Sequence, residues 1–240
     1  HGKPVVCEKP FTINAAQATD VIDAARKQGV FLMEAMWTRF LPIMARLRAL
    51  LAAGAIGDLR MIASDFGFRT TVNPRSRLFD PALGGGGLLD VGVYAVSLAS
   101  MVFGAEPERI ATMADIGDTG VDEQAAMILG YSGARMAMLW TAVRTSTPME
   151  TTIMGSDGMI RIHRPSWAAT TMTISRAGRS DEFVELTFPG NGYQFEAAEA
   201  MRCLRAGLNQ SPIMPLEETL AVMRTMDGIR SQWGLKYPME

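Results

Sequence analysis

The stretch Val5-Val6-Cys7-Glu8-Lys9-Pro10-Phe11 decides how the rest of the chain is interpreted. Its first three residues are apolar and predict a short buried strand. Pro10 ends that strand, because proline has no N–H to donate to a neighbouring strand, and it favours an extended backbone at Lys9. The stretch therefore predicts a lysine at the carboxyl end of a strand, which is the edge where open α/β sheets bind ligands. The alternative is an ordinary charged turn.

A helix and a second strand follow at the spacing of a βαβ unit. Asn14 stands at the position of a helix N-cap, residues 15–28 carry apolar side chains at helical spacing, and Gly29 is typical of a helix end. Residues 30–33 (VFLM) are apolar and predict a second buried strand. A unit of this length predicts two parallel strands joined by a right-handed crossover.

Further along the chain the pattern changes. A helix is expected at 42–53, a strand at 59–68, a polar loop with four glycines at 70–87, and a buried helix at 88–103. Seven strands then follow, several of them separated by tight turns, which favours antiparallel pairing: 109–115, 123–131, 134–142, 151–154, 159–163, 172–176 and 182–188. Two helices, 193–208 and 217–233, end the chain. The expected fold is an α/β part followed by an α+β domain with a largely antiparallel open sheet, covered by helices on one face.

Composition and charge argue against several classes of protein. The 240 residues are 48% hydrophobic and 20% charged, which is typical of a globular fold, and the net charge of −2 gives no reason to expect binding to nucleic acid or to a membrane. Cys7 and Cys203 lack metal-ligand spacing, and His1 and His163 are far apart, so no metal site is expected. Two unpaired cysteines favour a reducing compartment, and we expect a cytoplasmic location.

Asp90 and Tyr94 stand four residues apart in the apolar segment 88–103, so both side chains lie on one face of the predicted helix. An aspartate in such a segment is unfavourable unless it has a partner. The alternative is that Asp90 interacts only with the positive end of the helix and that Tyr94 only packs.

These stretches together resemble the glucose–fructose oxidoreductase, inositol dehydrogenase and rhizopine-catabolism (Gfo/Idh/MocA) family. Glu8-Lys9-Pro10 is similar to the Glu-Lys-Pro signature of that family, and the glycines at 84–87, Asp90 and Tyr94 match its second motif in order and spacing. Residues 192–196 (GYQFE) follow in the same order, so the resemblance covers essentially the whole chain. Residues 34–40 and 211–216 are most similar to the dimeric dihydrodiol dehydrogenases and the NADP-dependent D-xylose dehydrogenases of the family.

The resemblance implies hydride transfer between NADP, or NAD, and a CH–OH group of a small polyhydroxylated substrate, either a sugar or a trans-dihydrodiol. Lys9, Asp90 and Tyr94 are then the catalytic candidates. The cofactor-binding candidates are Glu8, Lys9 and Pro10, and Trp37 is expected to line the substrate pocket.

The resemblance also implies how these residues act. A free tyrosine, with a pKa of about 10, is a poor base, and a nearby ammonium favours the phenolate. We therefore expect Lys9 to lower the pKa of Tyr94, and we expect Asp90 to hold Lys9 or a substrate hydroxyl in place.

The resemblance divides the chain into two parts. Residues 1–36 are expected to be the C-terminal remnant of a Rossmann domain, and residues 37–240 a domain for substrate binding and dimerisation. The Gly-x-Gly-x-x-Gly turn that binds pyrophosphate is absent from the sequence. We therefore expect a piece of a longer oxidoreductase. The alternative is a non-catalytic oligomerisation or ligand-binding module derived from the family. Either way, we expect a homodimer or larger assembly formed through the open sheet face.

Overall fold

The chain begins with the predicted strand–helix–strand unit. In the computed structural model, which describes residues 1–104 and 106–240, β1 (Val5–Glu8) pairs in parallel with β2 (Leu32–Ala35), and α1 (Ala15–Gln28) connects them. The side chain of Asn14 accepts a hydrogen bond from the backbone N of Gln17 at 2.9 Å, as expected of an N-cap. Gly29 ends the helix with a φ of 61°. The predicted βαβ unit and both ends of its helix are confirmed.

The prediction that β1 is buried is wrong. Val5 and Val6 are 47% and 44% exposed, whereas all four residues of β2 are buried. Within the described chain this sheet has two strands, so both are edge strands, and β2 is the one that packs against α5 (Leu216–Trp233). An apolar sequence alone does not show which strand a helix will cover.

The second sheet has eight strands in the order β10-β9-β8-β7-β3-β6-β5-β4. Its strands closely match the predicted ranges: β3 (Leu59–Gly67), β4 (Arg109–Ile116), β5 (Asp122–Tyr131), β6 (Arg135–Ala142), β7 (Thr151–Gly155), β8 (Gly158–Ile162), β9 (Thr171–Arg176) and β10 (Glu182–Glu185). Its one parallel pair is β3 with β6, and the other neighbours are antiparallel. The mostly antiparallel open sheet is confirmed.

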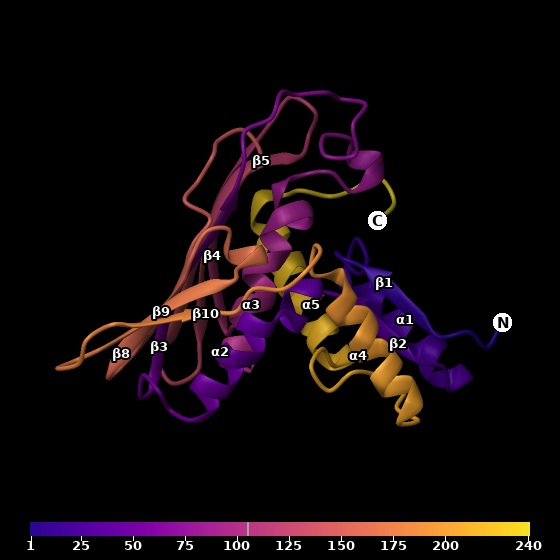
Figure 1. The fold of residues 1–240 in the computed structure, drawn as a ribbon. Helices are drawn as coiled ribbons and strands as arrows, with labels where there is room; N and C mark the ends of the chain where they lie inside the picture. Colours follow the sequence, from indigo (N-terminus) through magenta and orange to yellow (C-terminus); the bar gives the residue numbers. More distant parts are fainter. Residues whose placement is uncertain (105) are drawn as a thin grey trace.

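Helices cover one face of this sheet (Figure 1). Helix α3 (Val93–Phe103) packs on β3 and β6, and α5 packs on β4, on α3 and on α1. Helix α2 (Pro42–Ala52) lies in the same layer, whereas α4 (Tyr193–Arg205) lies beside α1 and β2 (Figure 1). Among the described residues, the opposite face of the sheet carries no helix (Figure 1). Because α5 contacts both sheets, it joins the N-terminal unit to the larger domain.

Short helical turns connect these elements. They are η1 (Trp37–Phe40), η2 (Pro81–Leu83), the π-helical turn η3 (Leu88–Gly92) and η4 (Ser166–Ala168). By length and composition, Pro81–Phe103, which includes α3, is long and apolar enough to cross a membrane. However, 78% of its most apolar stretch of 18 residues is buried in the fold. It is a core helix, as the sequence predicted.

Asp122 anchors the start of this core helix to the sheet. The side chain is fully buried, Oδ2 accepts a hydrogen bond from the backbone N of Leu88 at 2.6 Å, and Oδ1 has no partner within the described chain. Burial of the carboxyl group raises its pKa to about 7, although the backbone N–H of Leu88 opposes the shift. A carboxylate is therefore less stable in the fold than in the unfolded chain.

We expect the free energy of unfolding to depend on this carboxyl group. Because its folded pKa exceeds the unfolded value, Asp122 contributes stability that is complete below about pH 4 and is lost as the pH rises to about 7, a loss of up to roughly 4 kcal/mol. Asp122→Asn should remove this share of the pH dependence in urea unfolding measured between those pH values. An unchanged slope in the Asn variant would contradict the assignment.

Candidate active site

Lys9 and Asp90 meet where β1 ends and the core helix begins. The Nζ of Lys9 donates a hydrogen bond to the main-chain oxygen of Asp90 at 2.6 Å and lies 3.7 Å from its Oδ1. The two side chains are only 15% and 13% exposed. Charged groups this far from water need partners, and here each supplies one for the other. The carboxyl end of β1 is thus joined directly to the helix that carries Asp90.

Tyr94 and Trp37 complete this cluster. The Nζ of Lys9 lies over the Tyr94 ring, 4.7 Å from its centroid, and the Nε1 of Trp37 donates a hydrogen bond to the Tyr94 Oη at 3.1 Å. The structure therefore brings together four of the six residues singled out from the sequence. The other two, Glu8 and Pro10, flank Lys9 in the chain. Glu8 is exposed at the end of β1, and Pro10 follows through a cis peptide bond.

Asp90 lies on a π-helical turn, which the sequence did not predict. The backbone N of Val93 donates to Leu88 O, five residues earlier, so the helix is wider over Leu88–Gly92 than in α3. Such turns are rare and occur frequently at functional sites. The predicted helix at 88–103 is confirmed, but its first turn is not a regular α-helix.

The predicted lowering of the Tyr94 pKa is wrong. Burial raises the pKa of the phenol to about 12, although the hydrogen bond from Trp37 opposes the shift. The ammonium of Lys9 lies over the ring rather than at the oxygen, so it does not offset the burial. Burial also lowers the pKa of Lys9, and this effect exceeds the attraction of Asp90. Both shifts favour the uncharged form of the group.

Aromatic side chains surround Tyr94. The Trp37 ring lies 4.8 Å from Tyr193 and 5.9 Å from Trp167, and Phe66 stacks on Trp167 at 5.3 Å with nearly parallel planes. Phe66 also lies 5.5 Å from Tyr94. We call Trp37, Phe66, Tyr94, Trp167 and Tyr193 the aromatic wall. The sequence singled out only two of its members, because the other three come from distant segments.

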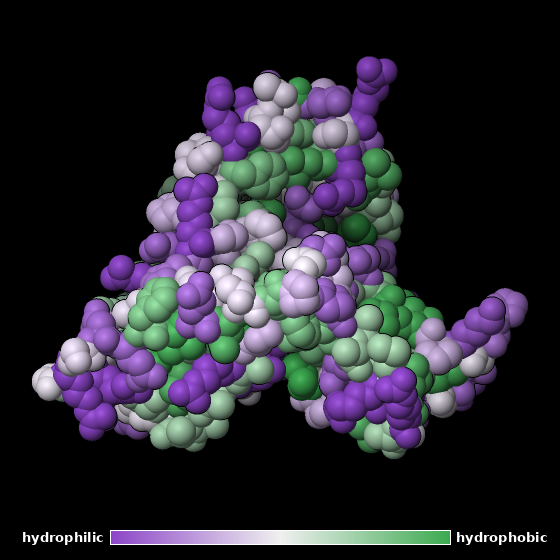
Figure 2. Space-filling model, viewed as in Figure 1, coloured by the Kyte–Doolittle hydropathy of each residue, from purple (hydrophilic) through white to green (hydrophobic). Residues whose placement is uncertain are grey.

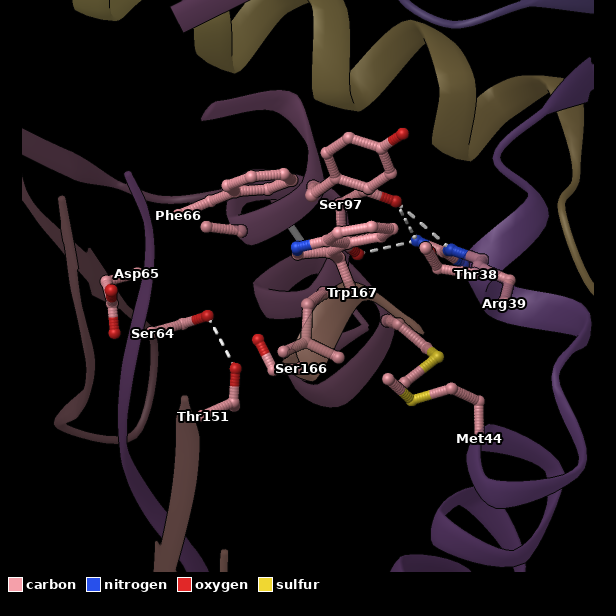
Figure 3. Close-up of a pocket in the computed structure, with 14 residues that line it drawn as sticks. Thr38, Arg39, Met44, Ser64, Asp65, Phe66, Ser97, Thr151, Ser166 and Trp167 are labelled. Carbon is pink, nitrogen blue, oxygen red and sulfur yellow. Dashed lines mark hydrogen bonds between the residues drawn. The ribbon is translucent and has the colours of Figure 1, made fainter. Parts of the chain in front are cut away.

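A small cavity of about 30 Å³ lies next to the aromatic wall, with Phe66 and Trp167 among its lining residues (Figure 3). A volume of this size holds about one or two waters and no substrate. Arg39 lines it and is only 3% exposed. It donates hydrogen bonds to Ser97 Oγ and Ser97 O, and it pairs with Glu218 at 2.6 Å. Arg39 therefore fixes η1, which carries Trp37, against both α3 and α5.

One further charged residue, Arg77, contacts the cluster, and another, Glu196, lies near Glu8. The Nη2 of Arg77, on the loop at 70–87, lies 2.9 Å from Asp90 Oδ1. Glu196, on α4, is 8% exposed, and its Oε2 is buried with no partner in the described residues. Burial, with a smaller contribution from nearby Glu8, raises the Glu196 pKa to about 7. No local signal in the sequence pointed to Arg77, and Glu196 stood out only as part of the motif at 192–196.

The site holds no metal-type cluster. Across residues 1–104 and 106–240, no group of three or more His, Cys, Asp or Glu side chains is placed to hold a metal ion. The Nζ of Lys9 and the Oη of Tyr94 are groups that can hydrogen-bond to an oxygen atom and exchange a proton.

Two family models match the chain. Residues 44–161 match the GFO/IDH/MocA C-terminal domain, and residues 1–36 match the oxidoreductase family described as an NAD-binding Rossmann fold. Both matches fall on the parts of the fold that supply the cluster.

Curated relatives match along the whole length of the chain. A trans-1,2-dihydrobenzene-1,2-diol dehydrogenase from Xenopus tropicalis is 40% identical over 99% of this chain and 73% of its own length. The human protein of the same name is 35% identical over 100% of this chain and 73% of its own length.

Solved structures share the fold. Aldose-aldose oxidoreductase from Caulobacter crescentus, complexed with glycerol, has a TM-score of 0.86 at 24% identity over 97% of this chain and 71% of its own. A 3-ketoreductase from Actinomadura kijaniata, in complex with NADP and TDP-benzene, has a TM-score of 0.84 at 24% identity. The match covers 96% of this chain and 71% of the ketoreductase chain.

The glycine-rich end of the loop allows us to test whether Asp122 fixes the turn at Gly86, whose main-chain oxygen accepts a hydrogen bond from the backbone N of Asp90. Gly86 has a φ of +112°, and a Cβ there would clash with Asp122 Oδ1, whereas Gly29 has a φ of +61° with nothing within 4 Å. We expect Gly86→Ala to lower the free energy of unfolding by at least about 2 kcal/mol more than Gly29→Ala, because both strain the backbone but only the first adds a steric clash. Urea unfolding measures the difference, and equal losses would show that Asp122 does not fix this turn.

Proposed function

This chain belongs to the Gfo/Idh/MocA family of oxidoreductases, and on that premise we propose that it transfers hydride between a nicotinamide dinucleotide and a CH–OH carbon of a cyclic diol or sugar. The observation that carries the proposal is the buried contact of Lys9 with Asp90 and Tyr94 at the carboxyl end of β1. Two groups that can exchange protons thus meet at the edge where parallel strands bind ligands. The relatives named for dihydrodiol oxidation support the substrate class.

The residues at this edge fit the nicotinamide end of the cofactor. Glu8 ends β1, and Lys9 and Pro10 follow it directly. The Oε2 of Glu196, which has no partner among the described residues, offers an acceptor for a hydroxyl or amide donor. When bound, the cofactor would accept or supply the hydride. NADP is proposed over NAD because the family includes a structural neighbour crystallised with NADP.

Lys9 and Tyr94 divide the handling of the proton. In this proposal Tyr94, whose pKa is raised to about 12, stays protonated near neutral pH and donates a hydrogen bond from Oη to the substrate oxygen. Lys9, whose pKa is lowered, gains the proton when the hydroxyl is oxidised and returns it when a carbonyl is reduced. Asp90 holds the Nζ of Lys9 through its main-chain oxygen.

The aromatic wall suits a flat substrate. Its rings offer apolar faces on which a dihydrobenzene ring or the C–H face of a sugar can stack, while the hydroxyls reach Lys9 and Tyr94. Trp37 has two roles in this arrangement, because it lines the wall and also orients the Tyr94 hydroxyl.

A pH profile tests these roles. In a full-length protein that restores the N-terminal part of the Rossmann domain, kcat/KM for oxidation of trans-1,2-dihydrobenzene-1,2-diol with NADP should rise with pH until Lys9 is uncharged and then level off. Lys9→Met and Tyr94→Phe should each lower it by about 10² to 10⁴. Lys27→Met, on the exposed side of α1, is the matched control and should keep the wild-type rate. Near-normal kcat/KM in the Lys9 or Tyr94 variant would exclude the assigned role.

The domain boundary and the location in the cell are part of the same proposal. We place the boundary between residues 36 and 37, because η1 begins the segment that packs against α2 and α4. Cys7 and Cys203 are free thiols, which favours the reducing environment of the cytoplasm.

We propose that a second copy of the chain covers the helix-free face of the sheet. Met113 on β4 and Ile128 on β5 are 79% and 47% exposed, which is unusual for large apolar side chains on a broad sheet. A two-fold contact between two such faces would bury the same residues on both copies. Figure 2 shows a separate hollow between the part of the molecule formed by α2 with β8–β10 and the part formed by α1 with α4.

Sedimentation tests the dimer. We expect the wild-type chain to sediment as a dimer at micromolar concentration and Met113→Asp to sediment as a monomer, because the carboxylate would be buried without a partner. Leu83→Asp, which changes an exposed apolar residue in η2 (58% exposed), should remain a dimer. A wild-type monomer would contradict the proposed interface.

A further inference from the structure

Arg77 reaches the candidate catalytic cluster from the loop at 70–87. Its Nη2 lies 2.9 Å from Asp90 Oδ1, and the Nζ of Lys9 lies 3.7 Å from the same oxygen. Two cations therefore share one carboxylate oxygen. The side chain of Arg77 is 65% exposed, so the pair lies at the boundary between the buried cluster and solvent.

The loop holds Arg77 in place on both sides. The next-but-one residue, Phe79, is buried, and its backbone N donates to Ser76 O at 3.0 Å. Further on, Gly86 N donates to Leu78 O at 2.8 Å, and the Tyr237 hydroxyl donates to Gly85 O at 2.7 Å. The guanidinium is thus carried on a well-anchored segment, although it is itself exposed.

Sharing the carboxylate changes what Lys9 contacts. The nearest acceptor of its Nζ is the uncharged main-chain oxygen of Asp90, at 2.6 Å, and the Tyr94 ring lies beneath it. The shorter contact to the carboxylate belongs to Arg77. An ammonium group that is paired fully with a carboxylate strongly retains its proton. Where an arginine already pairs with that carboxylate, the ammonium group is stabilised less and releases its proton more easily.

We propose that Arg77 is a positioning residue that occupies the Asp90 carboxylate and so leaves Lys9 free to gain and lose a proton at the substrate. The inference rests on the role proposed above for Lys9. The charged groups that face Lys9 agree with it: Asp90 and Glu8 favour the ammonium, whereas Arg77 opposes it. Burial of Lys9, like the charge of Arg77, lowers the pKa of its ammonium group.

Competitive acetylation of the chain measures the protonation of Lys9 without any turnover. Only the uncharged amine reacts, so the rate at Lys9 as a function of pH, over roughly pH 6 to 11, reports its titration. The other three lysines, Lys3, Lys27 and Lys236, serve as internal references in the same digest. The variants are Arg77→Met, Arg77→Lys and, as the matched control from the same loop, Arg75→Met.

In Arg77→Met, we expect acetylation of Lys9 to become roughly tenfold slower at a pH below its midpoint, because Asp90 then pairs with Lys9 alone. Arg77→Lys, which keeps the cation, and Arg75→Met should stay close to wild type, and the three reference lysines should not change. In the oxidation assay, kcat/KM of Arg77→Met should begin to rise at a higher pH than that of the wild type, and it should reach the same plateau. A residue that only supported the loop would lower the plateau instead.

An unchanged Lys9 titration in Arg77→Met would overturn the inference. If the titration moves as expected but the wild-type chain oxidises none of the diols or sugars, the shared carboxylate stands and the proposed function fails. The two results are distinguishable because acetylation requires no substrate or cofactor.

Discussion

The contact of the Lys9 ammonium with the main-chain oxygen of Asp90 is the constraint on which the rest of the site depends. It joins the end of a strand in one sheet to the first turn of the helix that packs on the other. Each partner is nearly buried, so separating them would leave a charged group without compensation. The contact requires that β1 ends, and the core helix begins, at the same point in space.

Burial then decides the chemistry of that point. It raises the pKa of Tyr94 and lowers that of Lys9, so the neighbouring groups are a phenol that retains its proton and an amine that releases one readily. If the same two residues were exposed to solvent, their pKa values would differ little from those of free side chains. The aromatic wall is therefore part of the low-dielectric surroundings that shift both pKa values, in addition to the substrate-stacking role proposed for it.

Local signals in the sequence predicted the local structure well. Asn14 and Gly29 marked both ends of α1, and the four-residue spacing of Asp90 and Tyr94 placed them on one helix. Properties that depend on distant neighbours were missed. The parallel pairing of β3 with β6, the exposure of Val5 and the approach of Arg77 to Asp90 all depend on segments that meet only in the fold. The raised pKa of Tyr94 was missed for the same reason, since burial is not visible in a motif.

Isotope transfer tests the central claim, that this cluster supports hydride transfer, most directly. A full-length protein that restores the N-terminal part of the Rossmann domain to this chain would be incubated with NADP and a trans-dihydrodiol that carries deuterium on its carbinol carbon. The cofactor would then be analysed by mass spectrometry. The account predicts one deuterium on the reduced nicotinamide, because the hydrogen passes directly from the carbinol carbon. Oxidised diol with no deuterium in the cofactor, or no oxidation of any diol or sugar offered, would contradict it.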